Sequence, residues 1–387
     1  MSLHGLVGHE GVRTALAEAY ARGSLPASLL IHGPRGVGKQ HLALWLARML
    51  VCDAPEGGPC ERCGPCRMAR ALEHPDIHWY FPLERPKGVS GDRLADALEN
   101  DRMHQLAEVR ADSLRSSFSD KVRGVYVGTV RNIRARAHKR PSMARGPVFI
   151  VGDADLLVPQ ESSPEAANAL LKLLEEPPGA AHFVLTSSEP GLLLPTIRSR
   201  TVPLYLGPLA DDLVAGFLKE HCDIDAEAAA RAAMLGRGAI GRALGFLDET
   251  DGKGPLEILR RDALDLVTAA TSGQTSSGYR VALAFPPARA RTLIDLFSFV
   301  EEWIRDFAAV ASGADDVVFN RDALPHLKKH VRERGIAAVD VPVAFSKVEG
   351  ARELARGNVN PQLVVSHLVR ELAAALVTLP TASPATR

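Results

Sequence analysis

Apolar residues in the first 80 positions follow a helical pattern, then a strand-like one, then a helical one again. Residues 13–22 are rich in Ala and Leu and predict a helix, and residues 28–31 predict a short buried strand. A glycine-rich turn at 33–38 follows, and from 40 to 51 the apolar side chains return to one face of a helix. A strand that leads through a glycine loop into a helix is typical of a parallel α/β fold.

Two more apolar runs, at 148–151 and 182–186, predict further buried strands. Residues 163–176 between them carry helix signals, because Ser162 and Glu165 fit a capping box at the start. Strands that alternate with helices extend the same parallel sheet. We therefore expect an α/β domain in the first half of the chain.

The remaining stretches depart from the α/β pattern. Residues 82–124 are highly charged with few apolar anchors, which indicates a partly helical insertion. Residues 207–247 are rich in Ala and predict a small helical domain, and residues 248–379 predict a longer all-helical one. Within the latter, the Ser, Thr and Gly content of 271–278 predicts a flexible connection, and 380–387 predicts a disordered tail.

Composition narrows the class of protein. A length of 387 residues is enough for two or three domains. Hydrophobic residues make up 46% and charged residues 24%, and the 46 basic side chains equal the 46 acidic ones, so net charge gives no argument for nucleic-acid binding. No apolar run reaches the ~18 residues of a membrane span, and the first residues lack a signal peptide pattern. We therefore expect a cytoplasmic protein without a membrane partner.

Four of the five cysteines lie close together in the sequence, as Cys52, Cys60, Cys63 and Cys66. Four thiolates at such short spacings can surround a zinc ion tetrahedrally, and a site with four protein ligands has no open position for catalysis. The sequence thus predicts a structural zinc module at 52–66, with free thiols as the alternative.

A Gly-Pro-Arg-Gly-Val-Gly-Lys segment between the first predicted strand and its helix is typical of a P-loop. Gly33, Gly36 and Gly38 let successive backbone amides turn toward phosphate oxygens, and Lys39 adds a full positive charge. The alternative is a glycine turn that binds no ligand. Gln40 stands where a P-loop has the Ser or Thr hydroxyl that holds magnesium, so ATP or ADP binding without hydrolysis fits the sequence best.

The end of the 148–151 strand shows the same departure. Gly152 stands where a magnesium-binding carboxylate is expected, and Asp153 stands where a glutamate would polarise water. The alternative for Asp153 and Asp155 is that they only cap the following turn. Two independent losses at magnesium positions argue against ATP hydrolysis.

Arginines provide two further candidates. The segment 196–201, after the 182–186 strand, contains Arg198 and Arg200, and an arginine at this place fits an arginine finger, whose planar fork reaches the γ-phosphate of a neighbouring subunit; the alternative is a surface ion pair. The basic run at 131–145 fits contact with a phosphodiester backbone, and a solvated helix face is its alternative.

Together these motifs resemble the AAA+ clamp-loader subunits of bacterial DNA polymerase III, of the delta prime type. The resemblance rests on the P-loop, on the cysteine module directly after it, on the Ala-Ala-Asn-Ala-Leu-Leu-Lys-Leu-Leu-Glu-Glu-Pro-Pro run at 166–178 and on Ser199-Arg200. It covers about residues 6–247, and Asn-Pro-Gln-Leu at 360–363 is similar to the start of the family's last collar helix.

The resemblance implies an AAA+ P-loop domain with its zinc module at 1–206, a helical lid at 207–247 and a helical collar at 248–379 that holds a five-subunit ring together. It implies a stator that does not hydrolyse ATP itself but presents Arg200 to the ATP of an adjacent motor subunit, and it puts Arg242 at the lid arginine position. The implied partners are the gamma/tau and delta subunits and, through the complex, the sliding clamp and primed DNA. Thr201 replaces the family's cysteine after Ser-Arg.

Two other functions remain open at this point. A gamma/tau-like motor ATPase would need magnesium ligands at positions 40 and 152, which this chain lacks. A stand-alone nucleotide-sensing module would not need the helical C-terminal third.

Overall fold

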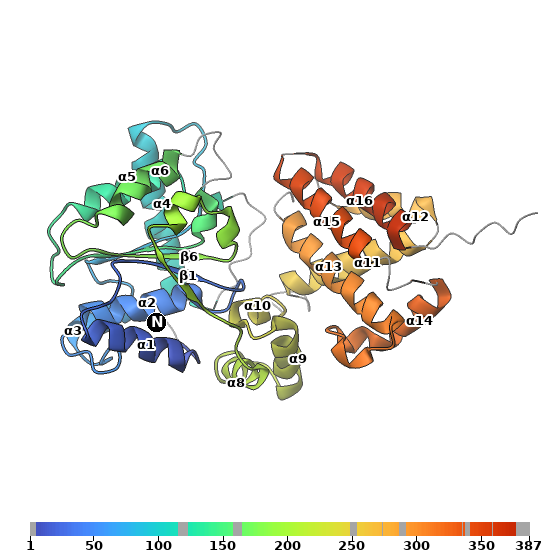
Figure 1. Ribbon diagram of the computed structural model, residues 1–387, viewed down its shortest axis with the longest axis horizontal. Coiled ribbons are helices and arrows are strands. Elements are labelled where there is room, and N and C mark those ends of the chain that lie inside the picture. The colour runs from blue at the N-terminus through green and yellow to red at the C-terminus, as the bar shows by residue number, and fades with distance from the viewer. Residues whose placement is uncertain are drawn as a thin grey trace, which may run out of the picture. The chain divides into compact units, whose positions relative to one another are not determined.

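The computed structural model describes residues 5–114, 123–157, 165–247, 254–272, 274–285, 292–334, 336, 341–357 and 359–376. The described residues divide into two compact units, one up to residue 244 and the other from residue 245 onward (Figure 1). The predicted tail at 380–387 and the Ser162 cap lie outside the described residues.

The first unit is built on a five-stranded sheet in the order β2-β5-β6-β1-β7. Every neighbouring pair is parallel, so the predicted parallel α/β sheet is confirmed. The strands are β1 (Ser28–His32), β2 (Ile77–Tyr80), β5 (Val148–Val151), β6 (His182–Ser187) and β7 (Val202–Tyr205).

Helices cover both faces of this sheet because alternate strand residues point to opposite sides. Val148 and Ile150 of β5 join the apolar cluster formed with α1 (Glu10–Ala21) and α2 (Lys39–Val51). Phe149 and Val151 join the opposite cluster, formed with α5 (Val127–Ala137) and α6 (Glu165–Glu175). Figure 1 shows α1 and α2 on one side of the strands and α5 and α6 on the other.

The predicted insertion contains a long helix, α4 (Asp92–Ala111), between two short strands, β3 (Leu83–Glu84) and β4 (Arg123–Gly124), which pair antiparallel. Leu94 and Leu98 of α4 are buried with Tyr126, which begins α5 as its N-cap. The expectation of a partly helical segment is therefore confirmed.

Several smaller helices complete the first unit. Two of them carry or adjoin candidate site residues: α3 (Gly64–Arg70) contains Cys66, and α7 (Pro195–Arg198) precedes Arg200. The unit ends with three helices, α8 (Asp211–His221), α9 (Ala226–Gly236) and α10 (Ile240–Leu244).

In the second unit every described element is helical, as predicted for the C-terminal part. The six α-helices described there are α11 (Pro255–Thr271), α12 (Thr275–Ala284), α13 (Thr292–Ala311), α14 (Leu324–Arg334), α15 (Val341–Arg356) and α16 (Pro361–Leu376). The flexible connection expected at 271–278 is wrong, because α12 already begins at Thr275. Gly278 packs against Val369 of α16 so closely that a Cβ there would lie 2.7 Å from a Val369 methyl group, so tertiary packing selects the helix.

The apolar stripe of α16 lies in the core of this unit. Val364, Leu368, Leu372 and Leu376 are all buried within the chain itself. Across the described ranges, no helix is both long and apolar enough to cross a membrane.

Candidate functional site

The glycine-rich loop between β1 and α2 has the backbone of a phosphate-binding turn. Gly33, Gly36 and Gly38 all have positive φ angles, of 152°, 82° and 105°. A Cβ at Gly33 would lie 2.1 Å from the Leu206 carbonyl oxygen, and one at Gly36 would lie 2.6 Å from the Arg242 amide nitrogen. The three glycines are therefore required by conformation and, at two positions, by close backbone packing.

Lys39 begins α2 and turns back over this loop. Its Nζ donates to the carbonyl oxygens of Gly33 (2.9 Å) and Pro34 (2.8 Å) and to the Ser188 hydroxyl (2.8 Å). Burial lowers the pKa of Lys39 to about 8, although Asp153 and Asp155 oppose the shift by their negative charge. The ammonium group lies where a P-loop lysine would meet phosphate oxygens.

The next residue, Gln40, joins α2 to β2 and to the turn that follows β5. Its Oε1 accepts a hydrogen bond from Trp79 Nε1 (2.9 Å), and its Nε2 donates to Asp153 Oδ2 (3.4 Å). A Cβ at Gly152 would lie 2.7 Å from Cδ, Nε2 and Oε1 of Gln40. The Gln40 carboxamide therefore occupies the space that a side chain at 152 would need.

These residues do not fit magnesium as a complete P-loop site does. A complete site needs a short hydroxyl side chain at position 40 and a carboxylate at position 152, after β5. This chain has the longer amide of Gln40 at the first position and a glycine, which has no side chain, at the second. Asp153 adopts a left-handed backbone (φ 45°), and its amide donates to Thr186 Oγ1 (3.0 Å). Asp153 directly precedes the short 3₁₀ turn at 154–157, and Asp155 lies within that turn.

The backbone next to Arg242, the lid arginine candidate, contacts the P-loop. Gly241, at the start of α10, donates its N–H to the Gly36 carbonyl (2.9 Å), so the loop and α10 touch directly. The Arg242 guanidinium donates from Nε to the Leu235 carbonyl at the end of α9 (3.2 Å).

The four predicted metal ligands come together. One Sγ atom from each of Cys52, Cys60, Cys63 and Cys66 lies within 4.8 Å of the others. Thiolates around a tetrahedral zinc with Zn–S bonds of about 2.3 Å are about 3.8 Å apart, so small shifts would complete the site. Cys222 is not part of this group.

Backbone hydrogen bonds reach three of the cluster sulfurs, and at Cys60 they favour the thiolate. Backbone N–H groups of Cys60, Cys63 and Cys66 each donate to the sulfur of the preceding cysteine of the set, at 3.3–3.4 Å. Hydrogen bonds from the Arg62 and Cys63 amides lower the pKa of Cys60 to about 6, while burial raises the pKa of Cys52 and Cys66. The buried Arg48, whose Nη1 pairs with Glu61 (3.2 Å), adds positive charge near Cys66. Four thiolates and a cationic neighbour suit a divalent metal, so the donor set fits zinc.

Arg200 lies at the surface of the first unit. Its guanidinium forms a fork with the Glu175 carboxylate at the end of α6, with N–O distances of 3.2 and 3.4 Å, and its Nη1 also donates to the Thr196 carbonyl (3.2 Å). The Arg200 side chain is 31% exposed and that of Glu175 is 57% exposed. The surface ion pair weighed as an alternative is thus present, and the arginine is still open to solvent. Thr201 is buried, and its hydroxyl donates to the Ile197 carbonyl (3.1 Å).

In the basic run at 131–145, one arginine forms an ion pair inside the first unit and the other basic side chains are exposed to solvent. Arg136 pairs with Glu99 of α4 (2.8 Å). The exposed basic residues of the run are Arg131, Arg134, His138, Lys139, Arg140 and Arg145.

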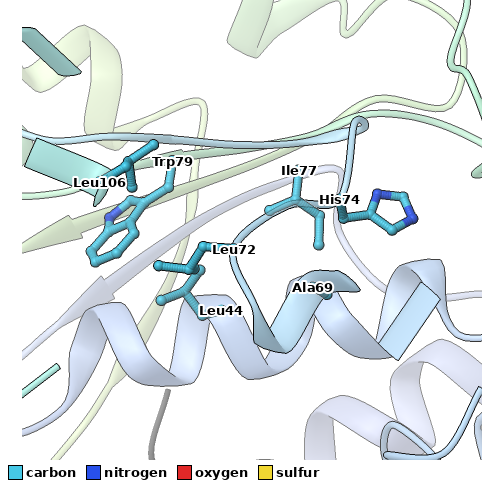
Figure 2. A pocket seen from close by; sticks show the side chains of 7 residues that line it. All are labelled: Leu44, Ala69, Leu72, His74, Ile77, Trp79 and Leu106. Atoms are coloured by element: carbon cyan, nitrogen blue, oxygen red, sulfur yellow. The ribbon is translucent and has the colours of Figure 1, made fainter. Parts of the chain in front are cut away.

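A small cavity lies between α2, the end of α3, β2 and α4 (Figure 2). Its lining is Leu44, Ala69, Leu72, His74, Ile77, Trp79 and Leu106. Burial lowers the pKa of His74, and its Nδ1 accepts a hydrogen bond from the Asp76 amide (3.2 Å). Trp79 therefore links this cavity to Gln40, but no carboxylate or nucleophile lines it.

Comparison with known protein families assigns the chain through its N-terminal half. The family model described as "DNA polymerase III, delta subunit" matches residues 8–210, more than half of the chain. The chain belongs to this family. The predicted resemblance to delta prime clamp-loader subunits is thereby confirmed, and so is the predicted fold class.

Individual relatives include both subunit types. The delta prime subunit of Escherichia coli is 30% identical over 59% of this chain and 57% of its own length. The gamma/tau subunit of Mycobacterium tuberculosis is 32% identical over 51% of this chain and 27% of its own length. A crystal structure of a gamma subunit-related protein from Thermotoga maritima covers 93% of this chain and 99% of that one at 18% identity, but its TM-score is only 0.36. The chain thus spans little more than half of the delta prime relative it matches.

Sequence reasoning missed the residues that hold the candidates in place. Trp79, Ser188 and Glu175 each contact a predicted site residue from another element. Their positions follow from the strand order, which no local motif encodes. Glu175 could have been found from the sequence, because it belongs to the run at 166–178 that resembles the clamp-loader subunits, and it ends the helix α6 that this run forms.

Proposed function

We propose that this chain is a delta prime-like stator subunit of the clamp loader of DNA polymerase III, which does not hydrolyse ATP itself. Family membership and the delta prime relatives support a clamp-loader role. The proposed partners are gamma/tau and delta subunits and, through the complex, the sliding clamp and primed DNA. A cytoplasmic location goes with this role.

The observation that carries the proposal is the Gln40 side chain on Gly152. Gln40 replaces the hydroxyl ligand expected at position 40, and its carboxamide fills the space of the carboxylate ligand expected at position 152. The hydrogen bond from Trp79 holds the carboxamide there. Gamma/tau relatives have a similar identity to this chain, but a motor of that type needs magnesium to neutralise the phosphates during transfer. We therefore prefer the stator.

In this role Arg200 acts in trans on the nucleotide of a neighbouring motor subunit. Its exposed position and the orienting Glu175 carboxylate support this assignment, because a planar guanidinium held at one side can still present N–H groups to a phosphate. Gly33, Gly36, Gly38 and Lys39, with Arg242 on α10, form the proposed nucleotide-binding residues of the chain's own P-loop.

The other parts of the chain have structural roles in the proposal. The four cysteines hold a structural zinc, which supplies the folding energy of the 52–66 module when bound. Residues 207–247 are the lid, and residues 248–379 are the collar that joins the ring.

ATP turnover by the purified chain tests the proposal. We expect no phosphate release above background, with or without primed DNA, because the magnesium ligands are replaced. Background should be defined with the Lys39→Ala variant, which removes the P-loop cation. Steady turnover by the wild type that disappears in Lys39→Ala would establish the motor alternative instead.

A further inference from the structure

We propose that the P-loop of this chain is a metal-free site for the diphosphate group of a nucleotide, in which the Gln40 carboxamide stands in place of the magnesium ion. The inference rests on the proposed non-hydrolysing function and adds the ligand class and its metal independence. It predicts that a nucleoside diphosphate is preferred over a triphosphate.

Exclusion of the metal follows from the contacts of Gln40. The amide is fixed at both ends, by Trp79 Nε1 on its oxygen and by Asp153 Oδ2 on its nitrogen. An amide nitrogen that faces a carboxylate is a donor and cannot bind a cation. At Gly152 no ligand atom is available, and any side chain placed there must first displace the Gln40 carboxamide.

The phosphate cradle itself is intact. The three glycines keep the positive φ angles that turn loop amides inward, and α2 begins directly after Gly38. Lys39 is buried, and its ammonium is held by two loop carbonyls and the Ser188 hydroxyl, so it is already positioned over the loop. A phosphate group can replace these neutral acceptors with a charged one, which strengthens the hydrogen bonds.

Charge around the loop limits the ligand to a short phosphate chain. Asp153 lies beside the loop, since its Oδ2 accepts a hydrogen bond from Gln40 Nε2 (3.4 Å), and the negative charges of Asp153 and Asp155 act to raise the pKa of Lys39. Without a divalent cation, the terminal phosphate of a triphosphate would meet these carboxylates uncompensated, and like charges repel each other more strongly in a partly buried site than in water. A diphosphate stays nearer the loop amides and Lys39.

Equilibrium binding of ADP and ATP to the full-length chain tests the proposal, by calorimetry in excess magnesium and again in EDTA. We expect the ADP affinity to agree within about threefold between the two conditions, and ATP in EDTA to bind about tenfold more weakly than ADP. Fluorescence gives a second readout, because Trp79 donates a hydrogen bond to Gln40 directly and its emission should change when a nucleotide binds at this loop.

Two variants serve as matched controls. Lys39→Ala should lose ADP binding in both conditions. Gln40→Thr combined with Gly152→Asp restores both ligand types and should make the affinity rise with magnesium, a gain that a merely structural role of Gln40 would not produce.

Three results would overturn the proposal: ADP affinity that magnesium raises about tenfold or more in the wild type, ATP that binds more tightly than ADP in EDTA, or no binding of either nucleotide. Each concerns affinity alone, so the stator function fails separately, through ATP turnover. The wild-type measurement decides the proposal even where the double variant does not fold.

Discussion

Glu99 connects the inserted helix α4 to the rest of the first unit. Its carboxylate accepts from Arg102 Nη2 (2.6 Å) and Nε (2.9 Å) on the same helix and from Arg136 Nη2 of α5 (2.8 Å). Arg102 also donates to the Trp79 carbonyl (3.1 Å) and lies over the Tyr80 ring, so the network reaches the edge strand β2. A buried guanidinium of this kind is stable only while its carboxylate is present.

Removal of this carboxylate should destabilise the first unit. We expect Glu99→Ala to lower the free energy of unfolding by about 3 kcal/mol, because Arg102 is left buried without its charged partner. Burial alone would raise the pKa of Glu99, but Arg102 and Arg136 outweigh burial and lower it. The stabilisation is therefore present above the carboxyl's ordinary pKa and is lost as the pH falls through the lowered pKa.

Urea denaturation of wild type, Glu99→Ala and Asp96→Ala measures this effect. Asp96 is exposed on the same helix and should change stability by less than about 0.5 kcal/mol. Equal stability of all three proteins at neutral pH would show that the network does not hold α4 in place.

Among the elements, the cysteine module should depend on its metal. We expect one zinc per chain and its loss in Cys60→Ser, because three thiolates cannot close the tetrahedral site. Amide exchange should then speed up in α3, since the Cys63 sulfur caps this helix through the Cys66 N–H. Metal analysis with exchange measured by mass spectrometry checks both effects.

Cys222→Ser is the control for the zinc prediction, because Cys222 lies outside the cluster. It should keep the metal and the exchange rates of the wild type. A wild-type chain with no zinc and four reactive thiols would disprove the assignment.

The strands that sequence reasoning found are the central ones. β1, β5 and β6 are buried on both faces and appear as apolar runs, whereas β2 and β7 are four-residue edge strands. In β2 buried and half-buried positions alternate, and β7 is mostly exposed, so neither shows a continuous apolar signal.

A partly helical insertion was predicted, but the bounds of its helix α4 were not, for a different reason. Its buried stripe includes a charged residue, Arg102, between Leu98 and Leu106, so the apolar periodicity is interrupted. The P-loop and the cysteine cluster could be predicted because their chemistry is local in sequence. The support from Trp79 and Glu175 depends on strand order and helix packing, which follow from the tertiary fold.

At the scale of the whole molecule, the second unit carries apolar side chains that its own core does not use. Leu363 of α16 is 66% exposed, and Leu283 and Tyr279 of the neighbouring helix α12 are 70% and 59% exposed. Gln362 donates to the Leu283 and Phe285 carbonyls and joins the two helices. Exposed apolar groups of this kind are typical of surfaces that bind another protein.

Assembly should depend on this surface if the second unit is the collar. We expect Leu363→Asp to weaken binding to the other clamp-loader subunits at least about tenfold, since a buried charge in an apolar interface is costly. The melting temperature should stay unchanged because the side chain is exposed. Size-exclusion chromatography of mixed subunits measures the binding. His367→Asp, exposed on the same helix, is the control, and full assembly of Leu363→Asp would argue against this surface.

ATP hydrolysis by a reconstituted clamp loader that contains Arg200→Ala tests the central claim most directly, because it gives a catalytic effect to a residue of a subunit that performs no catalysis. Arginine fingers in other P-loop systems contribute about 10³–10⁵ in rate at the site they serve, and only one site of the ring would lose its finger. We therefore predict an assembled complex with normal zinc content, a partial loss of clamp- and DNA-stimulated hydrolysis, and slower clamp loading. Arg198→Ala, exposed on α7 two residues away, should behave like wild type. Wild-type hydrolysis and loading by a fully assembled Arg200→Ala complex would contradict the account.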